Sequence, residues 1–207
     1  MSTDSLDSTR AAELLARQDA LQAEAARVIA ALGLPELLAR AGRVEQIGSS
    51  VSGLMVWRDI DFNIVAPGLT REGLAETIRP LLVDSRVIGL HFDEEIGARS
   101  ISGTAHDDRY YVVFHYLTEA GDDWKIDLSF WLADAPRGQL AHLAYLKERL
   151  TPELRLTILH LKDLWHRRPS YPYTVGGYEI YDAVLEHNVR TPDDFAAYLR
   201  DHDLPDD

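Results

Sequence analysis

Five stretches of the chain follow the alternating or continuous apolar pattern of β-strands that bury one or both faces. The clearest spans 109–117, and the turn at 119–122 leads from it into 123–132. Two strands joined this way are expected to pair as an antiparallel hairpin. The other stretches are 44–47, 59–65 and 86–94. The pattern therefore predicts a sheet of about five strands.

Apolar residues at helical spacing surround these strands. Residues 10–32 carry Leu14, Leu21 and Val28 on one stripe, and Gly33 ends that helix. Thr70 is predicted to cap a helix that runs to about Val83. Further helices are expected at 35–41, 138–150, 152–165 and 177–188, and from 192 onward.

Helices before, between and after the strands indicate an α+β protein with a mixed sheet. Three parts are expected: N-terminal helices packed on the core (1–42), a sheet domain (43–135) and a C-terminal helical domain (136–207). The last boundary follows Asp134-Ala135-Pro136, after which no further strand is predicted.

Two acidic residues open the second strand. Side chains alternate between the faces of a strand, so Asp59 and Asp61 point the same way, whereas Ile60 and Phe62 point the other. Neighbouring carboxylates repel each other unless a cation lies between them, and Mg²⁺ prefers such oxygen ligands. The simpler interpretation is the solvated face of an edge strand.

A Gly-Ser turn precedes this pair. Ile47-Gly48-Ser49, a variable segment and then Asp59-Ile60-Asp61-Phe62 together resemble the signature of the polymerase β-like nucleotidyltransferase superfamily. In that superfamily the Gly-Ser turn opens a helix and holds the triphosphate, and the two acids bind the catalytic metals. The resemblance implies these roles for Gly48 and Ser49, and for Asp59 and Asp61.

A third carboxylate lies on a later strand. Lys125, Asp127 and Ser129 share one face of 123–132, and Asp127 stands alone between apolar neighbours, where an unpaired charge is costly to bury. The resemblance places the third catalytic acid of the superfamily at Asp127, as metal ligand and general base. Asp122 and Asp123 in the preceding turn are the alternatives.

The C-terminal half carries a second, weaker resemblance. Leu161-Lys162-Asp163-Leu164-Trp165 and Gly176-Gly177-Tyr178-Glu179-Ile180-Tyr181 look like elements of poly(A) polymerase-like and oligoadenylate synthetase-like helical domains. The resemblance implies that Lys162 contacts the triphosphate and that the segment with Tyr178 approaches the nucleotide. The Ser that precedes the aromatic residue in those relatives is missing. Arg58 and Arg167 are further candidates for nucleotide, substrate or phosphate contacts.

The composition of the chain argues against some classes of binding partner. A net charge of −13 argues against a protein that wraps long nucleic acid, which needs clustered Lys and Arg. The chain has no cysteine and no run of about eighteen apolar residues, so disulfides and a membrane span are not expected. A cytoplasmic protein is the default expectation, and the sequence does not indicate an oligomeric state.

These observations predict a nucleotidyltransferase that transfers a nucleoside monophosphate, AMP from ATP, to a hydroxyl of a small molecule and releases pyrophosphate. Two Mg²⁺ ions held by the three carboxylates are expected as cofactors. By analogy the chain resembles the small bacterial antibiotic nucleotidyltransferases. The alternatives are a toxin-type nucleotidyltransferase that modifies tRNA or a protein, and a non-catalytic nucleotide-binding or partner-binding relative.

Overall fold

The computed structural model describes residues 6–135 and 138–206, so the predicted boundary at Pro136 lies outside the described residues. The chain forms two compact units. The sheet unit comprises Gln22–Ser52 and Arg58–Ala144. The helical unit comprises the residues up to Leu21, Gly53–Trp57 and the residues from Tyr145 onward. The division into 1–42, 43–135 and 136–207 stays a prediction.

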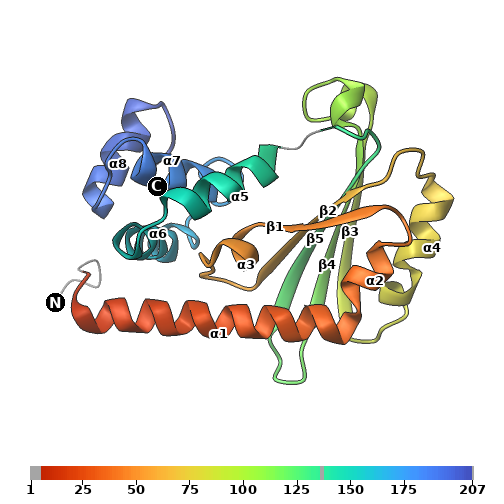
Figure 1. Cartoon of the computed structure of the whole chain (residues 1–207), viewed down its shortest axis with the longest axis horizontal. Helices are drawn as coiled ribbons and strands as arrows, with labels where there is room; N and C mark the ends of the chain where they lie inside the picture. Colours follow the sequence, from red (N-terminus) through yellow and green to blue (C-terminus); the bar gives the residue numbers. More distant parts are fainter. Residues whose placement is uncertain (1–5, 136–137, 207) are drawn as a thin grey trace. The chain divides into compact units, whose positions relative to one another are not determined.

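The sheet unit contains a five-stranded mixed sheet in the order β1-β2-β5-β4-β3 (Figure 1). Its strands are β1 (Arg43–Ile47), β2 (Asp59–Val65), β3 (Val87–Glu95), β4 (Arg109–Leu117) and β5 (Asp123–Trp131). β2 and β5 are parallel, whereas the β1–β2, β5–β4 and β4–β3 pairs are antiparallel. The α+β class, the number of strands and the 109–132 hairpin are confirmed.

One face of the sheet is apolar. Ile60 on β2, Phe114 on β4 and Ile126 on β5 are each at most 1% exposed. Helix α4 (Arg71–Leu82) lies at this face, since its Arg71 guanidinium stacks 5.1 Å from the ring centroid of Phe92 on β3. Thr70 caps α4 as predicted, by accepting a hydrogen bond from the Gly73 amide. The opposite face carries Asp59 and Asp61 of β2 together with Lys125 and Asp127 of β5.

Short helices complete the sheet unit. α2 (Leu34–Leu38) buries Leu34 and Leu38, and α3 (Ser49–Ser52) follows β1 directly. The connection between β3 and β4 forms two 3₁₀ turns, η1 (Gly97–Arg99) and η2 (Ala105–Asp107). The 25-residue helix α1 (Ser8–Leu32) contributes residues to both units.

The helical unit contains the end of α5 (Gly138–Arg149) together with α6 (Pro152–Trp165), α7 (Gly177–Leu185) and α8 (Pro192–Asp201). Its core includes Ile158, Leu161 and Trp165 of α6, as the predicted stripe requires. The Trp165 ring meets Phe195 of α8 edge to face, with centroids 4.8 Å apart. Among the described residues, no helix is both long and apolar enough to cross a membrane.

Candidate metal and nucleotide site

Parallel pairing of β2 with β5 brings three carboxylates together. Asp61 lies opposite Asp127 in the register, and Asp59 lies opposite Lys125. One oxygen from each of Asp59, Asp61 and Asp127 falls within 4.8 Å of the other two. We call these three residues the carboxylate triad.

Burial of the apolar face of the sheet determines on which face the three carboxylates lie. Ile60 beside Asp59 and Asp61, and Ile126 and Leu128 on either side of Asp127, are at most 1% exposed. A shift of one residue in register would bury the acids and expose this core, so the alternation holds the carboxylates on the opposite face. Their side chains remain only partly exposed, 14% for Asp59 and 15% for Asp127.

Lys125 supplies positive charge within the triad. Its Nζ donates a hydrogen bond of 2.6 Å to Asp127 Oδ2 and another of 3.4 Å to Asp59 Oδ1. Burial by itself lowers the pKa of Lys125, but the charges of Asp59 and Asp127 outweigh this effect, so the pKa is raised. The ammonium is therefore charged at neutral pH and cancels one of three negative charges.

Tyr111 on β4 supports Asp127. Its hydroxyl donates a 2.6 Å hydrogen bond to Asp127 Oδ2, the oxygen that also accepts from Lys125. Burial raises the pKa of Tyr111 strongly, and the hydrogen bond to Asp127 raises it further. The phenol therefore stays protonated and acts as a donor. The other oxygen, Asp127 Oδ1, is buried and has no hydrogen-bond partner among the described residues.

The donor set of the triad suits a hard divalent cation. All three ligands are carboxylates, the ligand type that Mg²⁺ favours. Among the described residues Asp127 Oδ1 is a buried acceptor without a donor, and a cation would satisfy it. The residues therefore fit a magnesium site, which Asp59, Asp61 and Asp127 would hold.

The Gly48-Ser49 turn packs directly against the triad. Gly48 has φ +77°, and a Cβ at this position would lie 2.0 Å from Asp61 Oδ2. Only glycine lets the backbone pass this close to the carboxylate with that conformation. The Gly48 carbonyl accepts from the Val51 and Ser52 amides, which begins α3 with Ser49 at its first position.

Arg58 and the alternative acids form a separate set of contacts. The Arg58 guanidinium pairs with Glu24 at 3.1 Å and with Asp122 at 2.9 Å. Asp123 lies half-exposed, 3.1 Å from His115 Nδ1. Asp127 is the β5 acid that joins Asp59 and Asp61, whereas Asp122 and Asp123 contact other groups.

The remaining predicted site residues belong to the helical unit. Lys162 is 2% exposed, and its Nζ donates to the Leu54 carbonyl at 2.8 Å and to the Tyr181 hydroxyl at 3.0 Å. Tyr178 is 64% exposed, and the Arg167 side chain is 69% exposed. The Lys162 ammonium thus has two partners inside its own unit, and its predicted contact with triphosphate stays a prediction.

Two partners of the triad were not assigned from the sequence. Alternation places Lys125 on the face of Asp127 but indicates no ion pair, and the pattern around Tyr111 predicts only a strand. The hairpin offers the missing signal, because its register sets Val113 opposite Asp127 and Tyr111 opposite Ser129. Tyr111 is then a diagonal neighbour of Asp127, within reach of a long aromatic side chain.

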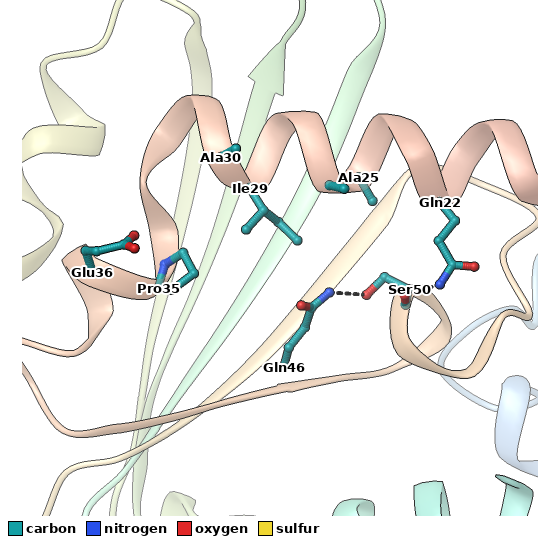
Figure 2. A pocket seen from close by; sticks show the side chains of 9 residues that line it. Gln22, Ala25, Ile29, Ala30, Pro35, Glu36, Gln46 and Ser50 are labelled. Carbon is teal, nitrogen blue, oxygen red and sulfur yellow. Dashed lines mark hydrogen bonds between the residues drawn. The ribbon is translucent and has the colours of Figure 1, made fainter.

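A pocket of about 420 Å³ lies on the other side of the sheet unit from the triad. Gln46, one of its lining residues, pairs with Phe62 and so faces away from Asp61. Figure 2 shows Gln46 and Ser50 pointing toward each other, joined by a 3.0 Å hydrogen bond, below Gln22, Ala25 and Ile29 of α1. The pocket is therefore separate from the carboxylates.

Comparisons with known proteins give a limited result. No family model matches the chain, and no curated protein matches it. A solved structure of a cytoplasmic RNA terminal U-transferase is 19% identical, with a TM-score of 0.46 over 80% of this chain and 51% of that chain. The chain spans about half the length of that protein. At this level of similarity the match assigns no substrate to this chain.

Proposed function

We propose that the protein is a metal-dependent nucleotidyltransferase that moves a nucleoside monophosphate from a triphosphate to a hydroxyl group. One observation carries the proposal: the carboxylate triad converges from two parallel strands while the Gly48 turn packs on Asp61. Three acids held together on a polar face repel one another, and a cation that joins them relieves this repulsion.

The reaction joins the acceptor oxygen to the α-phosphorus and breaks the bond from that phosphorus to the pyrophosphate oxygen. Bound Mg²⁺ would stabilise charge on the attacking and leaving oxygens. Asp59, Asp61 and Asp127 would hold the cation, and Asp127 would also take up the hydroxyl proton of the acceptor. Gly48 and Ser49 donate hydrogen bonds to the triphosphate from the turn beside Asp61.

Within this class we propose ATP as the donor, AMP as the group transferred and a small hydroxylated molecule as the acceptor. The acidic chain supports a small acceptor, because its net charge of −13 opposes binding to a long polyanion. Transfer to tRNA or to a protein is the competing outcome.

Calorimetry with Mg²⁺ and each of the four nucleoside triphosphates tests the site. We expect binding that needs Mg²⁺ and is lost in the double variant Asp59→Ala plus Asp61→Ala. Asp93→Asn is the matched control, because Asp93 is a half-exposed strand carboxylate that contacts His91. Binding that persists in the double variant would remove the triad from the mechanism.

Incubation with α-labelled triphosphates then identifies the acceptor. Small hydroxylated compounds, tRNA and protein are separate arms of the assay, and a parallel reaction with γ-labelled triphosphate measures the release of pyrophosphate. Label on a small molecule supports the proposal, whereas label on tRNA or protein establishes the competing outcome. Triphosphate binding with no transfer in any arm would favour a nucleotide-binding protein without catalysis.

A further inference from the structure

Lys125 occupies a position beside the triad where a cation is expected. Its ammonium contacts Asp127 Oδ2 at 2.6 Å and Asp59 Oδ1 at 3.4 Å, one oxygen on each of the two strands. The side chain is 20% exposed, so the charge is held among the acids and does not extend into solvent. Lys125 therefore bridges β5 and β2 as a bound ion would.

The two oxygens of Asp127 have different surroundings. Oδ2 accepts from both Lys125 and Tyr111, each at 2.6 Å. Oδ1 is buried and accepts from no described residue. A carboxylate oxygen that already accepts two short hydrogen bonds is a poor ligand for another cation, so Asp127 has one oxygen left for a metal.

From this division we infer that the triad binds a single divalent cation and that the Lys125 ammonium takes the place of a second one. The inference rests on the proposed function and revises its expected stoichiometry from two Mg²⁺ ions to one. Asp127 Oδ1, Asp59 and Asp61 hold the ion, while Lys125 and Tyr111 hold Asp127 Oδ2.

Charge supports the same arrangement. Three carboxylates and one ammonium carry a net charge of −2, which one divalent cation neutralises. A second divalent cation at Asp127 would have to displace Lys125 from Oδ2 or lie beside its positive charge, and like charges at such distances repel strongly in a partly buried site.

Manganese electron paramagnetic resonance tests the number of ions directly. Mn²⁺ is titrated into the native protein, alone and with α,β-methylene ATP, a triphosphate analogue that resists cleavage at the α-phosphorus. Two ions in one site lie about 3.5–4 Å apart and give a spin-coupled spectrum, which Mn²⁺ bound to free nucleotide does not. We expect one bound ion for each chain and no coupled spectrum.

Variants at Lys125 give the matched comparison. Lys125→Met keeps an unbranched side chain one atom shorter and removes the charge, so we expect a second, spin-coupled Mn²⁺ and at least about tenfold tighter binding of the first. Lys125→Arg keeps the charge and should bind one ion. Asp61→Asn, which should lose the ion, locates the signal at the triad, and thermal unfolding of each variant checks that it is folded.

The outcomes separate the inference from the function on which it rests. A coupled pair in the native protein, or a single ion in folded Lys125→Met, would overturn the inference and leave the nucleotidyltransferase proposal standing. Absence of Mn²⁺ binding in both native protein and Lys125→Met would overturn the metal site, and the proposed function with it.

Discussion

The sheet unit and the helical unit each hold a cluster of charged side chains, but the ratio of acidic to basic groups differs between the two clusters. In the helical unit one carboxylate, Asp163, is 3% exposed and pairs with Arg10 and Arg17, with Arg167 4.0 Å away. In the sheet unit three carboxylates lie together, and Lys125 forms ion pairs with two of them, Asp59 and Asp127. The first cluster has surplus positive charge and all its acid paired, whereas the second keeps surplus negative charge.

This difference separates a structural cluster from a binding site. A buried carboxylate with two guanidinium partners has no need of a ligand, and removing it leaves cations without their partner. Acids in excess of their cations repel one another in the absence of a ligand, so a bound cation relieves the repulsion. The convergence of three carboxylates is therefore the reason why we propose a metal site in the sheet unit.

The largest expected effect comes from neutralising one acid in each cluster. Asp163→Asn should lower the free energy of unfolding by about 2–3 kcal/mol, less than for a fully buried pair because Arg10 and Arg17 are partly exposed. Asp61→Asn should leave that energy unchanged or raise it, and should abolish Mn²⁺ binding. Urea unfolding and manganese titration check both variants. Equal destabilisation by the two changes would contradict the comparison.

A smaller effect is expected from crowding the acidic cluster. Gly48→Ala places a methyl group against Asp61 Oδ2 at a positive φ. We therefore expect the free energy of unfolding to fall by about 2–3 kcal/mol and Mn²⁺ to bind at least about tenfold more weakly. Gly68→Ala is the control, because Gly68 has φ +79° and nothing within 4 Å of the added carbon.

Backbone strain alone should lower the free energy of unfolding of Gly68→Ala by about 1 kcal/mol and leave metal binding unchanged. If Gly48→Ala behaves like this control, contact between the turn and Asp61 is not important for the site.

Lys162 tests whether the helical unit supplies a phosphate contact. Lys162→Met removes the donor of the Leu54 carbonyl and the Tyr181 hydroxyl, so we expect a loss of about 1–2 kcal/mol in unfolding free energy. The KM for triphosphate should stay unchanged if the buried ammonium is structural. A raised KM, absent from the exposed-lysine control Lys147→Met, would establish the predicted triphosphate contact.

The smallest effect concerns pH. Burial lowers the pKa of His166 below its ordinary value of 6.5, so the folded protein takes up this proton less readily than the unfolded chain. The contribution of His166 to stability is therefore present above about pH 6.5 and is lost as the pH falls below it. His166→Gln should show a shallower loss of stability between pH 7 and 5 than the native protein, measured by urea unfolding. A slope equal to that of the native protein would contradict this expectation.

Local pattern predicted most of the sheet. The strand predicted at 109–117 matches β4 at both ends. Alternation also predicted that Asp59, Asp61 and Asp127 lie on the face of their strands opposite the apolar residues. Boundaries were less exact where the backbone departs from regular geometry. The helix expected at 177–188 ends at Leu185, and Asn188 adopts a left-handed conformation, with φ 54°, that no helix continues.

Partners of charged groups were harder to predict. Alternation states which face a side chain lies on, but the distance from Lys125 to Asp59 depends on strand order, which no local pattern contains. Lys162 illustrates the same limit. Its helical position suggested an exposed or phosphate-binding residue, whereas the structure buries it against Leu54 and Tyr181, residues distant in sequence.

Parallel pairing of β2 with β5 also has a consequence for the time course of folding. Lys125 and Asp59 lie 66 positions apart in the chain, and β3 and β4 form in the intervening segment. Such distant pairing carries a large loop-closure entropy and forms slowly compared with the β4–β5 hairpin. The carboxylates cannot converge before this step, so uptake of Mn²⁺ during refolding should follow hairpin formation and report the completed sheet.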